Sequence, residues 1–290
     1  MKTLQKTAIS TAAVALLAGL STVAFAADEP AAAPEVSPIT ANVTVASSYV
    51  YRGLTQTNNK PAIQGGFDYA HESGFYVGNW NSNISWISDG YNNQTPTTTA
   101  PIEMDFYGGF KKELIGEGFA SDFGVLQYYY PTSGLPGINK GLANAGSTRQ
   151  LSGTTPSTTE IYAAQNYTFG AVTGFLKFSY GLTNLFGINN SKGSFYPDLT
   201  ANYDTGLYGV TLNAHVGYQY VPNDVQGYKM SYTDWKFGLT KDFGGGLSGA
   251  VAYTGTNIAK APGSSSYVYT TANGGSAGKA TGIVSLTKAF

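Results

Sequence analysis

The chain lacks cysteine altogether, and only 11% of its residues are charged. Without cysteine it has no disulfide bonds, no thiol nucleophile and no lipid-modified cysteine behind a leader segment. In ordinary soluble domains about a quarter of the residues are charged, so this composition indicates a surface that lies largely outside water. Beyond the amino-terminal segment there is also no apolar run of about 18 residues, which excludes helical membrane spans.

Tyrosine, phenylalanine and glycine are abundant, with 22, 15 and 37 copies. From Val43 to Phe290 the sequence divides into about twelve stretches of roughly ten residues in which every second side chain is apolar. Because lipid cannot hydrogen-bond an exposed backbone, strands cross a bilayer only as a closed barrel. The sequence therefore predicts an all-β, transmembrane, antiparallel up-and-down β-barrel of about 12 strands. The clearest apolar series is Tyr208, Val210, Leu212, Ala214, Val216, Tyr218 and Tyr220.

The amino-terminal segment, residues 1–26, has the features of a secretory signal peptide. Lys2 and Lys6 form its basic start, an apolar stretch follows, and Ala24 and Ala26 provide the small side chains of a cleavage site. We expect cleavage after Ala26. An uncleaved helical anchor is the alternative, but the apolar run is short for a membrane span.

The mature chain is expected to have one folded domain. Residues 27–38 are rich in Ala and Pro and predict a short disordered tail. Residues 39–290 form the outer-membrane β-barrel, since closure of a barrel needs every strand and leaves no internal boundary. An exported barrel of this kind belongs in the outer membrane of a Gram-negative cell. The charge balance is slightly acidic and does not suggest nucleic acid as a partner.

The connections between the predicted strands alternate between short and long. Outer-membrane barrels place short turns in the periplasm and long loops outside, so both termini are expected in the periplasm. The two largest connections, roughly 131–157 and 257–279, would then face the medium. We expect strands at about 40–54, 62–72, 74–87, 101–112, 119–130, 158–168, 171–182, 195–204, 207–221, 230–243, 246–256 and 280–290.

Strand parity assigns side chains to the two faces of the wall. On the first strand it predicts Val43, Val45, Tyr49 and Tyr51 toward lipid and Arg52 toward the lumen. Strand 119–130 is apolar on both faces, so its phase stays open. The pore-lining candidates are Arg52, Asp68, Glu103, Asp105, Glu160, Lys177, His215, Asp234 and Lys236, with Glu72 and Lys111 as further inward residues. Aromatic girdles at the two interfaces are expected to include Tyr51, Tyr69, Trp86, Tyr220 and Trp235.

Several segments resemble the TorF family of porin-like proteins, which are proteobacterial outer-membrane barrels of formerly unknown function. The similarity extends over nearly the whole mature chain. It implies the barrel fold and, in keeping with the family's label, a porin activity. The segments are Ser48–Gln56 (SYVYRGLTQ), Pro61–Tyr69 (PAIQGGFDY), Gly74–Gly78 (GFYVG), Ile102–Gly109 (IEMDFYGG), Tyr232–Lys236 (YTDWK) and Ser285–Phe290 (SLTKAF).

For the histidines and the paired carboxylates, the sequence favours structural roles over catalytic ones. His71 is expected at the periplasmic rim as an interface residue. His215 could serve as a base for a lipid-modifying enzyme, but it faces the lumen, on the wrong side of the wall from lipid. Glu103 and Asp105 share a strand face and could pair as acid and base or bind a cation; the alternative is that they are lumen charges hydrogen-bonded to cations or tyrosines. The sequence has no metal-ligand motif and no nucleophile elbow, and predicts no cofactor.

The leading hypothesis is a porin-like channel for passive diffusion of small polar or ionic solutes through a narrow, charge-lined lumen. More inward carboxylates than cations predict a weak preference for cations. The first alternative is a closed barrel whose extracellular loops bind a partner or surface, without transport. The second, which the sequence favours less, is a lipid-modifying enzyme. Other expected partners are outer-membrane lipid, lipopolysaccharide and the barrel assembly machinery, which would read Val284, Leu286 and Phe290 at the end of the chain.

Overall fold

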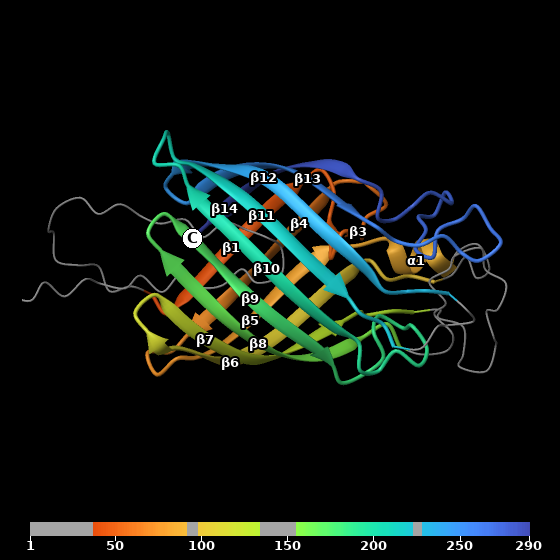
Figure 1. The fold of residues 1–290 in the computed structure, drawn as a ribbon, viewed down its shortest axis with the longest axis horizontal. Helices are drawn as coiled ribbons and strands as arrows, with labels where there is room; N and C mark the ends of the chain where they lie inside the picture. The colour runs from red at the N-terminus through yellow and green to blue at the C-terminus, as the bar shows by residue number, and fades with distance from the viewer. Residues whose placement is uncertain (1–36, 92–97, 134–154, 223–227) are drawn as a thin grey trace, which may run out of the picture.

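The computed structural model describes residues 37–91, 98–133, 155–222 and 228–290 (Figure 1). Twelve antiparallel strands close into a barrel, each paired with its neighbour in sequence, and β1 pairs with both β4 and β14. The barrel strands are β1 (Ile39–Ala46), β4 (Ala62–Ala70), β5 (Phe75–Asn83), β6 (Ile102–Gly116), β7 (Phe119–Tyr129), β8 (Thr158–Phe169), β9 (Val172–Gly181), β10 (Phe195–Asp204), β11 (Val210–Gln219), β12 (Tyr232–Gly244), β13 (Leu247–Thr256) and β14 (Thr281–Ala289).

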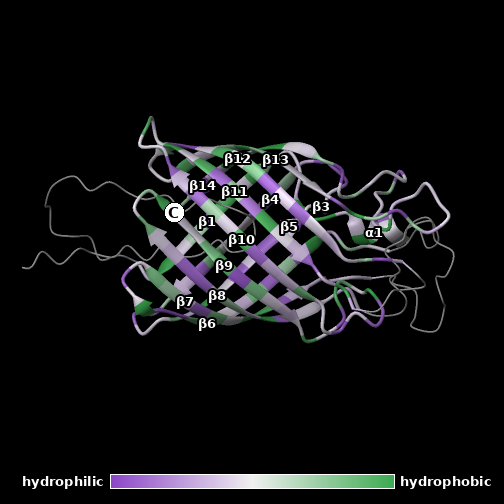
Figure 2. Cartoon of the chain, in the orientation of Figure 1, coloured by the Kyte–Doolittle hydropathy of each residue, from purple (hydrophilic) through white to green (hydrophobic). Residues whose placement is uncertain are grey.

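The outer surface of the barrel carries the apolar residues of the period-two pattern. Ile63 and Phe67 on β4 are exposed, while the residues that follow them, Gln64 and Asp68, are buried inside. The same alternation runs around the wall, where hydrophobic and hydrophilic positions follow one another along the strands (Figure 2). Every strand is hydrogen-bonded on both sides, so the barrel has no free edge. The predicted fold class is confirmed.

The first predicted strand, 40–54, is wrong beyond Ala46. The chain leaves the wall there and forms a two-stranded hairpin, β2 (Val50–Tyr51) and β3 (Leu54–Thr55), inside the barrel. Tyr49 is only 1% exposed, so the lipid-facing placement of Tyr49 and Tyr51 is also wrong. A small hairpin alternates its side chains at period two as a wall strand does, and the sequence pattern cannot separate the two.

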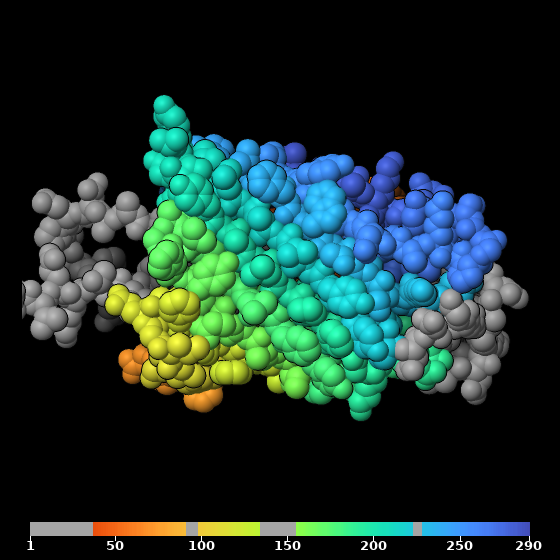
Figure 3. Space-filling view, in the orientation of Figure 1, coloured from red at the N-terminus to blue at the C-terminus, as the bar shows by residue number. Residues whose placement is uncertain are grey.

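Three smaller expectations also fail. Trp86 lies in the short helix α1 (Trp86–Tyr91), where it is buried against Tyr130 and belongs to no girdle. Glu72 is an exposed turn residue. The strand predicted from 207 begins at Val210, because Tyr208 and Gly209 adopt left-handed φ values of 53° and 64° in the preceding turn. In the space-filling view this turn, in teal, projects from the barrel end (Figure 3).

The two ends of the barrel differ as the loop lengths predict. The carboxyl terminus lies at the end with the short turns, and α1 lies with the long connections at the other (Figure 1). The open question of strand 119–130 is resolved by β7, where Phe123 and Val125 are exposed and Asp122 and Leu126 are buried inside. No helix in the described part of the chain is long and apolar enough to cross a membrane. The predicted signal peptide and nearly all of the predicted tail lie outside the described residues, as does most of 131–157.

Candidate channel lumen

The hairpin, which we call the inner hairpin and define as residues 48–57, crosses the lumen from β1. The hydroxyl of Tyr49 donates to Oε1 of Glu103 on β6 at 2.5 Å. The hydroxyls of Tyr51 and Tyr128 on β7 are hydrogen-bonded to each other. Burial, and then the carboxylate of Glu103, raise the pKa of the Tyr49 phenol well above its usual value, so Tyr49 remains a donor. The inner hairpin is thus fixed to the wall by polar contacts.

Arg52 at the tip of the inner hairpin makes the most extensive contacts. Its guanidinium donates to both carboxylate oxygens of Glu160 on β8, at 3.0 and 2.7 Å, and to Oε1 of Gln219 on β11 at 2.7 Å. It also lies over the rings of Tyr51 and Tyr196, at 5.0 and 4.3 Å. A bidentate, charge-assisted pair of this kind is among the stronger polar contacts in proteins. Arg52 therefore links two separated parts of the wall across the lumen.

The backbone at this tip is tightly placed. Arg52 and Gly53 both have left-handed φ values, 44° and 73°, and a Cβ at Gly53 would collide with Asp234 and Thr256. The carbonyl of Arg52 accepts a hydrogen bond of 2.9 Å from the hydroxyl of Tyr232. Only glycine fits position 53, because it combines a positive φ with a close approach to the wall.

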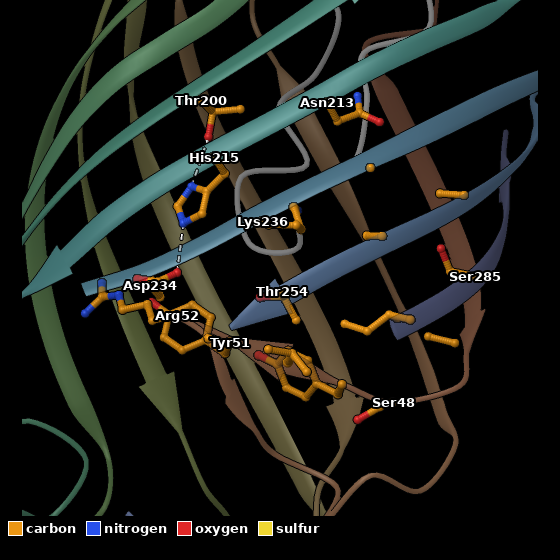
Figure 4. A pocket seen from close by; sticks show the side chains of 18 of the residues that line it. Ser48, Tyr51, Arg52, Thr200, Asn213, His215, Asp234, Lys236, Thr254 and Ser285 are labelled. Carbon is orange, nitrogen blue, oxygen red and sulfur yellow. Dashed lines mark hydrogen bonds and ion pairs between the residues drawn. The ribbon is translucent and has the colours of Figure 1, made fainter. Parts of the chain in front are cut away.

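The inner hairpin divides the lumen into two cavities. The larger, about 180 Å³, lies on the side of the short turns and is lined by β9–β14 and β1. Figure 4 shows Arg52 and Tyr51 at its border, with His215, Asp234 and Lys236 on the wall. The smaller, about 30 Å³, lies among the long connections. Tyr51 and Arg52 line both cavities, so the partition between them is the inner hairpin itself.

The wall of the larger cavity is built mainly from small hydroxyl and amide side chains around one charged cluster. His215 on β11 lies between two carboxylates, with Nδ1 2.9 Å from Asp198 and Nε2 2.9 Å from Asp234. The hydroxyl of Tyr196 donates to Asp234 at 2.8 Å. Lys177 is buried on β9 with its ammonium 4.2 Å from the ring centre of Tyr162, a cation–π contact.

The opposite part of the lumen, along β4–β8, is filled by tyrosines bound to carboxylates. Hydroxyl groups donate from Tyr107 to Asp68 at 2.5 Å, from Tyr76 to Asp122 at 2.6 Å and from Tyr130 to Glu103 at 2.7 Å. Trp80 packs edge-on against Tyr49 with ring centres 5.3 Å apart. Asp105 differs from these acids: it is completely buried, and neither carboxylate oxygen has a hydrogen-bond partner among the described residues.

The structure separates the predicted pore-lining residues into two groups. Arg52, Lys177, His215, Asp234 and Lys236 line the larger cavity. Asp68, Glu103, Asp105 and Glu160 face inward but are packed beneath tyrosines and the inner hairpin.

The prediction omitted two further inward acids, Asp122 and Asp198. Asp122 lies on the strand whose phase was open. Asp198 could have been assigned by parity on strand 195–204. Hydrogen bonding of lumen acids to tyrosines was one of the two alternatives, but parity cannot show which tyrosine contacts which acid, because the partners lie on different strands.

Apolar side chains pack together at the end with the long connections. Leu185 and Ile188 from the β9–β10 connection pack with Val268 and Tyr269 from the β13–β14 connection and with Leu54 of the inner hairpin. Within the described residues no cluster of three or more His, Cys, Asp or Glu could hold a metal ion.

Comparison with known proteins gives a family and a fold. Residues 29–290 match the family described as "Bacterial protein of unknown function (Gcw_chp)". The resemblance to the TorF family stays a prediction. No curated protein matches the chain by sequence.

Among solved structures, the chain is similar to the KdgM porin, with a TM-score of 0.50, 7% identity and coverage of 87% of this chain and 99% of that one. At this identity the likeness shows a shared barrel fold. The NanC porin gives a TM-score of 0.48 at 10% identity over 87% of this chain and 98% of its own. The COG4313 outer membrane channel from Pseudomonas putida F1 gives 0.48 at 11% identity over 91% of this chain and 100% of its own.

Proposed function

The chain belongs to the Gcw_chp family of bacterial proteins of unknown function, and from its lumen we propose that it is an outer-membrane channel for passive diffusion of small polar or ionic solutes. The observation that carries this proposal is a polar, charged cavity of about 180 Å³ inside a barrel whose outer wall is apolar. A barrel that only anchored loops would have no need of buried lysines and carboxylates, which are costly to place in a wall.

The size of the barrel supports a narrow pathway. Eight-stranded barrels are filled by side chains, whereas barrels of about sixteen strands leave a wide aqueous channel. Twelve strands lie between these limits, and here part of the lumen is filled while part is hollow. The proposed solutes are therefore small, and charged side chains along the cavity would select among them.

The proposal includes an orientation in the outer membrane, with lipid and lipopolysaccharide against the apolar wall. The short turns would lie in the periplasm and the long connections outside. An epitope inserted at Gly274 should then bind antibody on intact cells, and one inserted at Gly245 only after permeabilisation. The reverse pattern would reject this orientation.

The channel proposal is tested with the purified, folded mature protein. In a planar bilayer it should give discrete conductance steps, and liposomes that contain it should swell in small sugars or amino acids faster than protein-free liposomes. Folding is checked by heat-modifiable migration on a gel. The absence of both conductance and swelling in the folded wild type and in a folded Arg52→Gln variant would reject the proposal.

A second candidate is a closed barrel whose extracellular connections bind a partner or surface, without transport. The apolar packing around Val268 and Tyr269 favours it, because this packing would close the lumen at the end with the long connections. A lipid-modifying enzyme is less well supported, since His215 is held between two carboxylates inside the barrel, away from the lipid-facing wall. We therefore propose that the protein is not an enzyme.

The carboxyl-terminal strand is proposed to carry the signal for the barrel assembly machinery. Val284, Leu286 and Phe290 are exposed on its outer face. The backbone N–H of Phe290 donates to the carbonyl of Ala41 at 2.9 Å, at the seam between β14 and β1. Deletion of Phe290 should lower the amount of folded barrel in the outer membrane, measured as heat-modifiable protein in membrane fractions. An unchanged amount would argue against the signal.

A further inference from the structure

Charge is unevenly distributed around the lumen. The part formed by β9–β12 is close to balanced, with Asp198 and Asp234 beside Lys177, Lys236 and His215. The part formed by β4–β8 is acidic. Among the described residues of these strands, the inward acids are Asp68, Glu103, Asp105, Asp122 and Glu160, and the inward lysine is Lys111, opposite Asp122. We call Glu103, Asp105 and Glu160, which lie closest to the inner hairpin, the acidic wall.

The inner hairpin covers this acidic wall and satisfies much of it. Tyr49 caps Glu103 and Arg52 neutralises Glu160. Asp105 follows Glu103 on the same face of β6 and is completely buried, without a hydrogen-bond partner for its carboxylate in the described part of the chain. Burying a carboxylate without a partner is costly. While the inner hairpin covers the acidic wall, the carboxylate of Asp105 therefore lacks a partner. Contact with water would lower the free-energy cost of this burial.

The contacts that hold the inner hairpin over these acids can be exchanged for water. They are the Tyr49–Glu103 hydrogen bond and the Arg52–Glu160 ion pair, and water can solvate each of these groups once the hairpin moves. The larger cavity lies directly beside Arg52, so water is close to the Arg52–Glu160 pair. Beyond Arg52 lies the smaller cavity of the long connections. Displacement of the hairpin would join the two cavities and would also remove Leu54 from the apolar cluster at the end with the long connections.

We propose that the inner hairpin is a gate, and that its departure uncovers the acidic wall, so that the open pore selects cationic solutes. The proposal rests on the channel function proposed above and names its solute class. When the hairpin leaves, Arg52 leaves with it, which removes a positive charge from the pathway and frees Glu160. Glu103 loses the hydroxyl of Tyr49, and Asp105 meets water. In a narrow lumen with walls of low dielectric constant, three such carboxylates attract cations and repel anions.

The gate is tested first by weakening its strongest contact. Arg52→Gln keeps a side chain that can hydrogen-bond but removes the charge paired with Glu160. Loss of a charge-assisted contact should raise the open probability of single channels in a planar bilayer by about tenfold or more. An open probability equal to that of the wild type would reject the gate.

A disulfide trap tests the gate by fixing the hairpin in place, and because the chain has no other cysteine only one cross-link can form. The N–H of Thr55 in the inner hairpin donates to the carbonyl of Ala277 in the β13–β14 connection at 2.9 Å. Thr55→Cys with Ala277→Cys should give a channel that closes on oxidation and reopens with a reductant, while each single variant does not respond. Unchanged conductance in the oxidised, cross-linked protein would also reject the gate.

Selectivity is then measured as the reversal potential under a gradient of potassium chloride. In the Arg52→Gln background, Asp105→Asn should shift it away from cation preference. Glu72→Gln, which removes an acid from an exposed turn, is the matched control and should leave it unchanged. In the oxidised trap, Asp105→Asn should have no effect on the residual current. If Asp105→Asn leaves the reversal potential of the Arg52→Gln channel unchanged, the role of the acidic wall in selectivity is rejected. The gate is not affected by that result.

These outcomes separate the gate from the channel function on which it rests. A wild-type protein that conducts steadily, with no response to Arg52→Gln or to the trap, retains the channel function and loses the gate. If neither the wild type nor the folded Arg52→Gln variant conducts or swells liposomes, the channel function itself fails.

Discussion

The two sides of the lumen obey the same alternation of residues and nevertheless differ in character. Along β4–β8 the inward positions carry Trp80, Leu126, Tyr128 and Tyr162, which fill the space together with the inner hairpin. Along β12–β14 they carry Gly238, Ala250 and other small or hydroxyl-bearing residues, and the cavity lies against them. Alternation decides only which side chains point inward, while their volume decides whether the lumen is packed or hollow.

Apart from the acidic wall, which the inner hairpin covers, the difference also separates stability from selectivity. The packed side buries aromatic rings and pairs nearly every acid with a tyrosine, so changes there should affect folding first. The hollow side has charged groups next to a cavity, so changes there should affect the solute and leave folding nearly intact. Four substitutions test this division.

The largest effect is expected for Trp80→Ala on the packed side. Loss of a buried indole in contact with Tyr49 should lower the free energy of unfolding by about 3–5 kcal/mol. The measurement is a urea titration of the folded barrel in detergent. Ser285→Ala on the hollow side is the control and should change stability by less than about 0.5 kcal/mol. Equal losses in the two variants would abolish the distinction between the sides.

Glu103→Gln should have the next largest effect. The carboxylate accepts hydrogen bonds from Tyr49 and Tyr130, and an amide offers one acceptor oxygen in place of two. We expect a loss of about 1.5–3 kcal/mol by the same titration. Asp198→Asn, in the hollow side, should cost less, because the cavity admits water to Asp198. A larger loss for Asp198→Asn would contradict this order.

Ala250→Phe tests whether the hollow side carries the solute. The phenyl ring would enter the cavity of about 180 Å³ that Ala250 lines. Single-channel conductance should fall to a minor part of the wild-type value, with the amount of folded protein unchanged. Ala250→Ser, which nearly preserves volume, should conduct as the wild type does. If Ala250→Phe conducts normally, solutes pass elsewhere.

The smallest effect is expected for Lys177→Met. The substitution removes an ammonium group from the hollow side but keeps the length of the side chain. Stability should change by no more than about 1 kcal/mol, since a cation–π contact with Tyr162 is lost while the burial of a charge is relieved. The reversal potential should move slightly toward cations. Lys192→Met, in an exposed connection, should not move it, and an equal shift there would point to a general surface-charge effect.

Some of these features could be predicted from the sequence and others could not. Parity placed Lys177, His215, Asp234 and Lys236 inside correctly, because the direction of a strand side chain follows from its position alone. It failed at Tyr49 and Tyr51, where the chain leaves the wall without a break in the pattern. It also could not show that Glu103 and Asp105 are covered, since this depends on which distant segment lies over them.

The sequence by itself determined the closed barrel, its approximate strand number and the alternation of its wall. It also determined that the short turns lie at the same end of the barrel as the carboxyl terminus. These follow from local spacing and from the requirement that a backbone in lipid be fully hydrogen-bonded. Only the tertiary structure decided that the segment after β1 folds into the lumen and that one side is packed and the other hollow. Those outcomes rest on partners far apart in sequence: Tyr49 and Glu103 are separated by 54 residues, and Arg52 and Glu160 by 108. No local pattern encodes such a pairing, because it depends on which strands closure of the barrel brings face to face.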